Sequence, residues 1–239
     1  MKRPSNKEWL ENLNKFYIEK ADVYEKLANA EDYRNDIFKQ TVKIFNPRGK
    51  VILDMGCGTG KYAIPFSKTA ERVYAVDMSK GMLKILKNKI KKKNIKSVKI
   101  IKSDYGKINL SKESIDLIFS TWSFPAHSKR WASDLSKLRK IIRKGGYMIL
   151  VDNYHGGEFW EIRKLVTDLK KDFCYGLDKW MLSKGFNRKI FDVLLEFKTK
   201  KRVRDVCGAF YGPSIAGYIL GKGKTWFRMR VAMWYWKKE

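Results

Sequence analysis

The sequence predicts an α/β protein built on a doubly wound, mostly parallel β-sheet. Short apolar segments alternate with amphipathic helical segments between residues 51 and 151. This alternation is typical of parallel strands joined by right-handed crossover helices. The first apolar segment leads into a turn with glycine at every second position, Gly56, Gly58 and Gly60. A strand followed by a glycine-rich turn and a helix is the ligand-binding corner of such sheets.

Strands are predicted where apolar and β-branched residues cluster. They cover residues 51–55, 72–76, 98–101, 115–120 and 147–151. The connecting helices are predicted near 60–70, after Ser79 as an N-cap, and at 131–143. We expect Gly145 and Gly146 to end the last of these helices.

The segments on either side of this core have their own patterns. Residues 6–45 show the three- to four-residue apolar spacing of helices, and a turn at 46–49 follows them. A loop and helix are expected at roughly 156–183. Strand formers concentrate at 187–197 and 225–236, and the segment between them, 202–220, is predicted to be helical.

The composition limits the classes of protein to which this chain can belong. A length of 239 residues with 44% hydrophobic residues suits one main domain with a sizeable core. No apolar run reaches the ~18 residues of a membrane-spanning helix, and residues 1–10 lack the apolar centre of a signal peptide. Cys57, Cys174 and Cys207 show no metal-ligand spacing. We therefore expect no metal site, no transmembrane segment and a reduced, cytoplasmic setting.

The net charge of +27 leaves two interpretations open. One is an anionic partner such as RNA or a lipid surface. The other is a lysine-rich composition over the whole surface. The 52 basic residues comprise 39 lysines and 13 arginines, spread along the chain. Because arginine does more of the specific reading of phosphates and bases, we favour the second interpretation, while nucleic-acid binding remains possible.

The acidic residue beside the glycine turn indicates what the turn binds. Asp54 stands two positions before Gly56, and the spacing is G-x-G-x-G. Dinucleotide-binding turns have the spacing G-x-G-x-x-G and place a pyrophosphate at a helix N-terminus. A carboxylate at the turn would repel a phosphate and attract a cation, such as the ammonium group of an amino acid. A nicotinamide oxidoreductase is therefore disfavoured.

The stretch Leu53-Asp54-Met55-Gly56-Cys57-Gly58-Thr59-Gly60 resembles the first motif of the class I S-adenosylmethionine-dependent methyltransferases. The resemblance covers roughly residues 45–152. It implies S-adenosyl-L-methionine as cofactor and a Rossmann-like, seven-stranded sheet whose last strand is antiparallel. It also implies an N-terminal helical lid at 1–45, a cofactor-binding core at 46–152 and, in the same domain, a C-terminal part at 153–239 that completes the sheet.

Three acids end three consecutive predicted strands, where ligands of open α/β sheets bind. Asp54 would hold the methionine ammonium group. Asp77 can accept hydrogen bonds from both ribose hydroxyls, and Asp104 resembles the family residue that accepts the adenine amino group. The predicted cofactor site as a whole consists of Asp54, Gly56, Cys57, Gly58, Gly60, Asp77, Met78, Asp104, Tyr105, Ser120 and Trp122.

The sequence indicates the catalytic groups with less detail than the cofactor-binding residues. Methyl transfer depends mainly on in-line positioning, and a base is needed only if the nucleophile must lose a proton. His127 and His155 lie in loops over the cofactor in this fold and are candidate bases, although each is equally an ordinary loop histidine. Tyr17, Tyr24 and Tyr33 are candidates to face the substrate from the lid.

The nature of the methyl acceptor stays open at this stage. The resemblance is to the ubiquinone- and menaquinone-biosynthesis type, so we expect a small-molecule or lipid-like acceptor. An RNA methyltransferase and a non-catalytic protein with a degenerate fold are the alternatives. Residues 120–124, Ser-Thr-Trp-Ser-Phe, replace the Asn-Pro-Pro-Tyr motif of many enzymes that methylate base nitrogens or glutamine amides, which makes those substrates less favoured. The sequence does not predict an oligomeric state.

Overall fold

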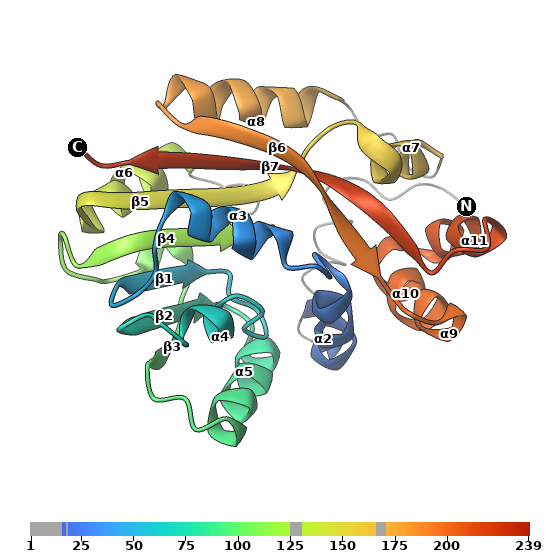
Figure 1. Ribbon diagram of the computed structural model, residues 1–239, viewed down its shortest axis with the longest axis horizontal. Helices are drawn as coiled ribbons and strands as arrows, with labels where there is room; N and C mark the ends of the chain where they lie inside the picture. The colour runs from blue at the N-terminus through green and yellow to red at the C-terminus, as the bar shows by residue number, and fades with distance from the viewer. Residues whose placement is uncertain (1–15, 18, 125–130, 166–170) are drawn as a thin grey trace.

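The computed structural model describes residues 16–17, 19–124, 131–165 and 171–239. Its centre is a seven-stranded sheet with the strand order β3-β2-β1-β4-β5-β7-β6 (Figure 1). The strands are β1 (Val51–Met55), β2 (Arg72–Asp77), β3 (Val98–Lys102), β4 (Ile115–Thr121), β5 (Ile142–Asn153), β6 (Asn187–Glu196) and β7 (Trp226–Lys237). The pairs among β1 to β5 are parallel, and β7 is antiparallel to both β5 and β6. The predicted fold, including the antiparallel last strand, is confirmed.

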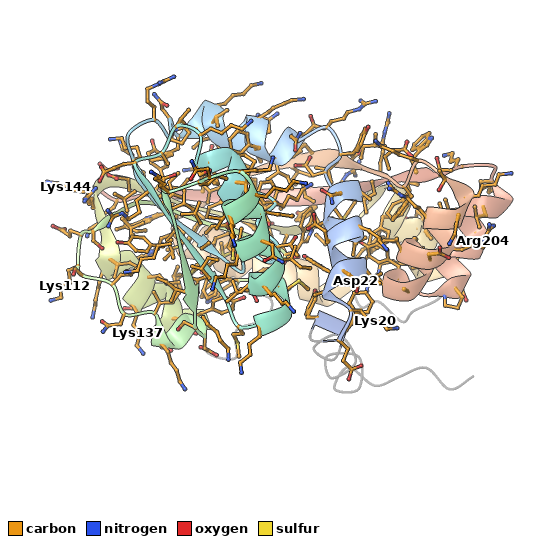
Figure 2. All side chains as sticks on the ribbon, turned by 90° about the horizontal axis from the view of Figure 1, so that it is seen from below. Lys20, Asp22, Lys112, Lys137, Lys144 and Arg204 are labelled. Carbon is orange, nitrogen blue, oxygen red and sulfur yellow. The ribbon has the colours of Figure 1, made fainter. Side chains whose placement is uncertain are left out.

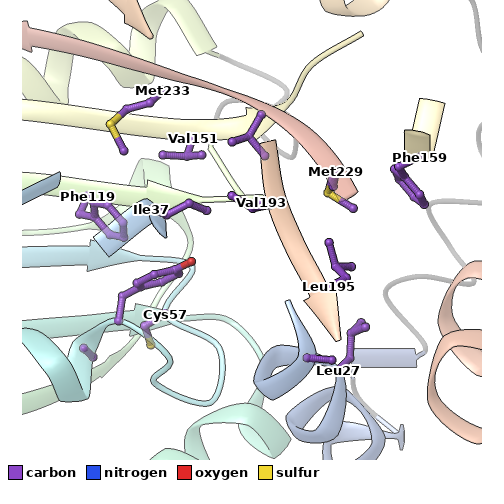
Figure 3. Close-up of a cluster of buried hydrophobic side chains, with 14 of the residues drawn as sticks. Leu27, Ile37, Cys57, Phe119, Val151, Phe159, Val193, Leu195, Met229 and Met233 are labelled. Carbon is purple, nitrogen blue, oxygen red and sulfur yellow. The ribbon is translucent and has the colours of Figure 1, made fainter. Parts of the chain in front are cut away.

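Helices cover both faces of the sheet because the strands bury side chains on both sides. All five residues of β1 are buried, as expected for a central strand of a doubly wound sheet. Ile52 and Phe119 face a core that also contains residues of α2 (Ala21–Ala30), α3 (Asp36–Ile44), α4 (Ala63–Phe66) and α5 (Lys80–Lys92). Figure 3 shows part of this core, with Ile37, Phe119, Val151 and Val193 close together.

The opposite face of the sheet packs against two helices. Leu53 and Met148 contribute to a second core with Leu138 of α6 (Trp131–Ile141) and Met181 of α8 (Lys171–Ser183). The buried Trp234 of β7 belongs to the same core. The two cores are separated by the sheet, so the central strands contribute to both in alternation.

The C-terminal half adds short helices at the end of the sheet that carries the site. These are α7 (Gly157–Lys164), α9 (Lys200–Arg202), a π-helical turn (Val203–Cys207), α10 (Gly208–Tyr211) and α11 (Pro213–Gly221). Figure 1 shows α2 and α9 to α11 gathered at this end. The predicted helical stretch at 202–220 is therefore four short pieces rather than one helix.

Two predicted helix boundaries near glycine or proline were wrong. The helix expected at 60–70 is limited to α4, because the Ser67 hydroxyl donates to the carbonyl of Ile64 at 2.7 Å and competes with the helical ladder. Gly145 and Gly146 do not follow a helix but lie inside β5, where the pairing with β4 shifts between Ile115 and Leu117. A Cβ atom on Gly146 would stand 2.9 Å from the carbonyl oxygen of Asp116, so the close approach requires glycine.

Within its described residues, the N-terminal segment contains α2, α3 and helical residues at 16–17 and 19. We call α2, α3 and residues 16–17, 19–20 and 31–35 the lid. Asp32, with φ of 43°, sits at the break between α2 and α3. Its carboxylate accepts from the backbone N–H groups of Asp36 at 2.7 Å and Ile37 at 3.1 Å, so it caps the first turn of α3. Residues 1–15 of the predicted lid lie outside the described residues.

The buried Asp178 offers a test of how the second core is held together. It accepts a hydrogen bond from Trp234 Nε1 at 2.9 Å and pairs with Arg188. Asp178→Ala leaves the Trp234 N–H without this acceptor and removes the carboxylate that pairs with Arg188, so we expect it to lower the unfolding free energy by about 3 kcal/mol. The control is Asp192→Ala, which removes the half-exposed pair with Arg230 and should cost less than about 1 kcal/mol. Urea unfolding of both variants measures the difference, and equal losses would contradict the assignment.

Candidate active site

A small pocket lies where the carboxyl ends of β1 and β4 meet the lid. Its walls come from the glycine turn, the end of β4 and α2, and the residues are Tyr24, Ala28, Glu31, Asp54, Gly56, Cys57, Gly58, Thr59, Lys61, Tyr62, Thr121 and Trp122. The cavity measures about 20 Å³, room for little more than one water molecule. Tyr24, Ala28 and Glu31 thus form one wall of a nearly filled pocket.

The glycine turn uses its glycines for two different purposes. Gly56, Gly58 and Gly60 all have positive φ, of 70°, 51° and 87°. A Cβ atom at Gly56 would stand 2.0 Å from Ser123 Oγ, and one at Gly60 2.3 Å from Leu86 Cδ1, so these two glycines are needed for packing. A Cβ atom at Gly58 would meet only Tyr24 of the lid, at 3.4 Å. Gly58 is thus the glycine whose backbone faces the pocket.

Asp54 is a buried carboxylate without a complete set of partners. It is 2% exposed, and its Oδ2 atom has no hydrogen-bond partner within the described part of the chain. Burial, and then the nearby charge of Asp77, raise the pKa of this carboxyl to about 7. A buried carboxylate with an unused oxygen on the wall of a pocket suits a ligand cation.

Asp77 is oriented by the backbone of the turn. Its Oδ2 accepts from the Gly58 N–H at 2.9 Å and its Oδ1 from the Ser79 N–H at 2.8 Å. Burial raises the pKa of Asp77, and the backbone hydrogen bonds from Ser79, Gly58 and Met78 oppose that rise. Each carboxylate oxygen accepts more than one hydrogen bond, so the group has capacity left for a pair of hydroxyls.

The predicted adenine-binding residues are less clearly arranged. Asp104 Oδ1 accepts from the Gly106 N–H at 2.7 Å and so caps a 3₁₀ turn at Tyr105–Lys107. The Tyr105 hydroxyl is bonded to Ser123, and its ring packs edge-on against Phe124 at 5.8 Å. Met78 is 61% exposed next to Asp77. These three residues lie at the ends of β2 and β3 but do not line the closed pocket.

Of the residues at the end of β4, Trp122 lines the pocket and Ser120 does not. Ser120 is fully buried, donates to the carbonyl of Met55 at 2.9 Å and accepts from the Phe124 N–H at 3.1 Å. It therefore ties β4 to β1. Trp122 has φ of 49° and donates from Nε1 to Asn153 Oδ1 at 2.9 Å.

Neither a reactive cysteine nor a histidine base stands out in the described pocket. Burial raises the pKa of the Cys57 thiol well above its usual range, so the thiol packs against the turn and is not activated. His127 lies outside the described residues. The His155 ring packs against that of Tyr154, with centroids 4.2 Å apart, and does not line the pocket.

Lysines hold the lid against the glycine turn. Lys61 Nζ donates to the carbonyls of Ala28 at 2.7 Å and Glu31 at 2.5 Å, at the end of α2. Lys89 Nζ pairs with Glu25 of α2 at 2.6 Å and donates to the carbonyl of Thr59 at 3.0 Å. These contacts place a cation at the C-terminus of α2, where the helix dipole favours it.

The lid brings two of its three candidate tyrosines to the site. Tyr24 lies over Gly58, and the Tyr17 ring packs edge-on against it at 5.2 Å. Tyr17 also receives a hydrogen bond on its carbonyl from Ser79, at 2.9 Å. Tyr33 is 42% exposed and lies beside Lys198 and Leu194, away from the pocket.

Several residues of the site were missed in the sequence, and four of them carry the contacts discussed below. They are Glu31, Lys61 and Tyr62, which line the pocket, and Tyr211, whose hydroxyl donates to Glu31 Oε1 at 3.0 Å. Glu31 follows the last residue of a helix and precedes Asp32. In a sequence, two adjacent acids at a helix end are typical of a solvent-exposed terminus. Its burial depends on Tyr211, 180 positions away, and no local pattern carries that contact.

The residues present fit a ligand that carries an amino acid and a nucleoside but no phosphate. Asp54 offers an unused buried oxygen to an ammonium group, and Asp77 presents a fixed carboxylate to vicinal hydroxyls. Lys61 is the lysine on the pocket wall, and its described hydrogen bonds go to the carbonyl oxygens of Ala28 and Glu31. Its cation is therefore used within the protein and does not provide a phosphate site.

Comparison with known proteins agrees with this arrangement. Residues 52–146 match the family described as methyltransferase domain. Phosphoethanolamine N-methyltransferase 3 of Arabidopsis thaliana is 32% identical over 103 residues, which are 42% of this chain and 21% of that protein. A demethylmenaquinone methyltransferase of a Geobacillus species is 24% identical over 146 residues, 54% of this chain and 61% of the relative. The chain thus spans between a fifth and three fifths of these two relatives.

A solved structure shares the fold. A SAM-dependent methyltransferase from Aquifex aeolicus aligns with a TM-score of 0.55 and 18% identity over 82% of this chain and 87% of that one. Residues 52–146 are thus similar to methyltransferase domains, and the chain shares the fold of a solved methyltransferase.

Proposed function

We propose that this chain transfers a methyl group from S-adenosylmethionine to a small-molecule acceptor. The observation that carries the proposal is Asp54, a buried carboxylate with an unpartnered oxygen on the wall of the pocket, beside Asp77. Such a pair suits the ammonium and ribose ends of one ligand. The proposed cofactor residues are those predicted from the sequence, except that Ser120 supports the site from within the sheet.

The residues of the chain have distinct tasks in this reaction. When bound, the cofactor supplies a methyl group that is already activated on a sulfonium. Asp54 binds the ammonium group, Asp77 fixes the ribose and Gly58 admits the ligand close to the backbone. Trp122 and the lid exclude water and hold the acceptor in line, and such positioning supplies much of the rate enhancement.

A small-molecule acceptor is favoured over RNA. Both relatives described above are named for small acceptors. The basic side chains are distributed around the molecule, and Figure 2 shows Lys112 and Lys144 projecting at one end and Arg204 at the other. Arg230, one of the arginines beside the aromatic residues of β7, is paired with Asp192. None of the described helices is long and apolar enough to cross a membrane. We place the enzyme in the cytoplasm, where buried thiols such as Cys57 and Cys207 stay reduced.

Calorimetry with S-adenosylhomocysteine, the demethylated cofactor, tests the proposal. We expect micromolar binding and no binding of NAD. Asp77→Ala should weaken binding by roughly 2–4 kcal/mol, about 30- to 1000-fold, because two charge-assisted hydrogen bonds are lost. Asp192→Ala, on an outer strand, is the control and should bind as the wild type does. Binding of NAD without binding of S-adenosylhomocysteine would overturn the proposed function.

The pH dependence of the same binding reports on Asp54. Below pH ~7 the buried carboxyl is protonated and accepts an ammonium group poorly, so affinity should rise as the pH increases through 7. Asp54→Asn should bind more weakly at pH 8 and lose most of this dependence. Calorimetry between pH 5.5 and 8.5 measures both curves. Parallel curves for the variant and the wild type would show that the ammonium group lies elsewhere.

Salt dependence separates a surface of dispersed lysines from an RNA-binding surface. We expect weak, sequence-independent binding of single-stranded RNA at physiological salt, and turnover that varies little with ionic strength. A true RNA substrate would give a log–log slope of about −0.7 for each phosphate contacted. Filter binding against a panel of cellular RNAs is the measurement, and tight binding to one RNA would favour the alternative.

A further inference from the structure

The carboxylate of Glu31 is buried beside the pocket with little to neutralise it. The residue is 6% exposed, and among the described residues the Tyr211 hydroxyl is its hydrogen-bond donor, at 3.0 Å. Lys61 lies near, but its described hydrogen bonds go to the carbonyls of Ala28 and Glu31 and not to a carboxylate. Burial raises the pKa of Glu31 to about 7, while Lys61 and Tyr211 lower it and Asp32 raises it. A carboxylate accepts about four hydrogen bonds, so this one has capacity left for a ligand.

Aromatic rings surround the same carboxylate. The Tyr17 ring is 5.2 Å from that of Tyr24, and Phe210 stands 6.3 Å from each of them. Tyr211 follows Phe210 directly, with the two rings 4.8 Å apart and perpendicular. The charge of Glu31 raises the pKa values of Tyr17, Tyr24 and Tyr211, which places it within range of all three hydroxyls. Ring faces and a carboxylate together are the recognition chemistry of an organic ammonium ion.

Two other buried acids, Asp54 and Asp152, add negative charge near Glu31. Asp54 shares the pocket, and Asp152 at the end of β5 is 8% exposed with its Oδ2 atom unpartnered within the described residues. The charge of Asp152 also reaches Tyr17. Lys61 also lines the pocket, but its described hydrogen bonds go to carbonyl oxygens, so a carboxylate or phosphate at the reacting end of the acceptor would meet a net excess of buried acids and be repelled. The acid-lined site is thus opposite in sign to the basic surface of the protein.

We propose that Glu31, Tyr211 and the rings of Tyr17, Tyr24 and Phe210 form the acceptor subsite, and that the acceptor is an amine whose nitrogen is methylated. This inference rests on the proposed function, because the amine must lie next to a bound methyl donor. Tyr24 connects the two sites, because its ring covers Gly58 of the glycine turn.

The chemistry balances without a further reactant. The amine enters as an ammonium ion, and one N–H proton passes to the Glu31 carboxylate, which leaves a lone pair on nitrogen. That pair attacks the methyl carbon as the carbon–sulfur bond breaks, and the bonding electrons go to sulfur. The product is a methylated ammonium ion and a neutral thioether, and the proton on Glu31 leaves to water. A carboxyl poised near neutral pH suits this task.

The acceptor enters only when the lid shifts. The rings contact one another and the cavity is about 20 Å³, so an amine must displace the Tyr17 end of the lid. The contacts of Lys61 and Lys89 with α2 hold the rest of the lid in place during that movement.

Choline and its neutral carbon isostere, 3,3-dimethylbutan-1-ol, are the probes that test the subsite. Both are titrated calorimetrically into the full chain saturated with S-adenosylhomocysteine. We expect choline to bind at least tenfold more tightly than the isostere, and Glu31→Gln to abolish this preference. Glu19→Gln, an exposed position on the same segment, is the matched control and should retain it. Equal binding of the two probes to the wild type, or an unchanged preference in Glu31→Gln, would overturn the subsite.

Measuring the binding of S-adenosylhomocysteine to the same proteins distinguishes a failure of the subsite from a failure of the proposed function. This binding should persist in Glu31→Gln, because the proposed cofactor contacts are those of Asp54 and Asp77. If the wild type fails to bind it, the proposed function fails; if binding is intact but the choline preference is absent, only the subsite fails.

A second variant covers the possibility that Glu31→Gln does not fold. Choline affinity should rise with pH through about 7 as Glu31 ionises. Tyr211→Phe removes a hydrogen bond that favours the ionised form, so the midpoint should move to higher pH. The charged and titratable groups that face Glu31 are Asp32, Lys61, Tyr17, Tyr24 and Tyr211, and the other four are unchanged in this variant. An unmoved midpoint would overturn the assignment to Glu31.

Discussion

The structure depends on carboxylates that are held out of water at one edge of the sheet. Asp54, Asp77 and Asp152 end β1, β2 and β5, and Glu31 reaches the same region from the lid. Burial raises the pKa of each of these groups. Desolvated charge of one sign is costly unless a partner of the opposite sign arrives. Lys61 offsets part of this cost near Glu31, and the proposed cationic ligands would offset more of it.

The lid covers this edge of the sheet and so keeps water away from the carboxylates. Lys61 and Lys89 fasten α2 to the glycine turn, and Tyr62 donates to Asp32 at 3.1 Å from the other side of the same turn. The aromatic rings of the lid and of α10 then fill the remaining space. One set of contacts thus excludes water, shapes the pocket and raises the pKa values of the acids.

Local patterns were sufficient for the sheet and for the residues at its edge. Each strand is a short apolar run, and Asp54 and Asp77 follow their strands directly, so parallel topology brings them together. Glu31 and Tyr211 could not be predicted in this way, because their contact joins two helices 180 residues apart. Gly145 and Gly146 were predicted to end a helix, as a glycine pair after a helical pattern normally does. Both lie inside β5 instead, where the close approach of the Asp116 carbonyl requires glycine at position 146. The roles of the individual cofactor residues remain proposals.

The position of β7 between β5 and β6 has a consequence for synthesis of the chain. The last strand to emerge is the one that joins its two neighbours. Until Trp226–Lys237 has left the ribosome, β5 presents an unpaired edge and β6 has no place in the sheet. Exposed edges of this kind pair readily with other chains. Chains that lack β7 would thus expose a strand edge that is open to pairing, and the twelve residues of β7 complete the sheet.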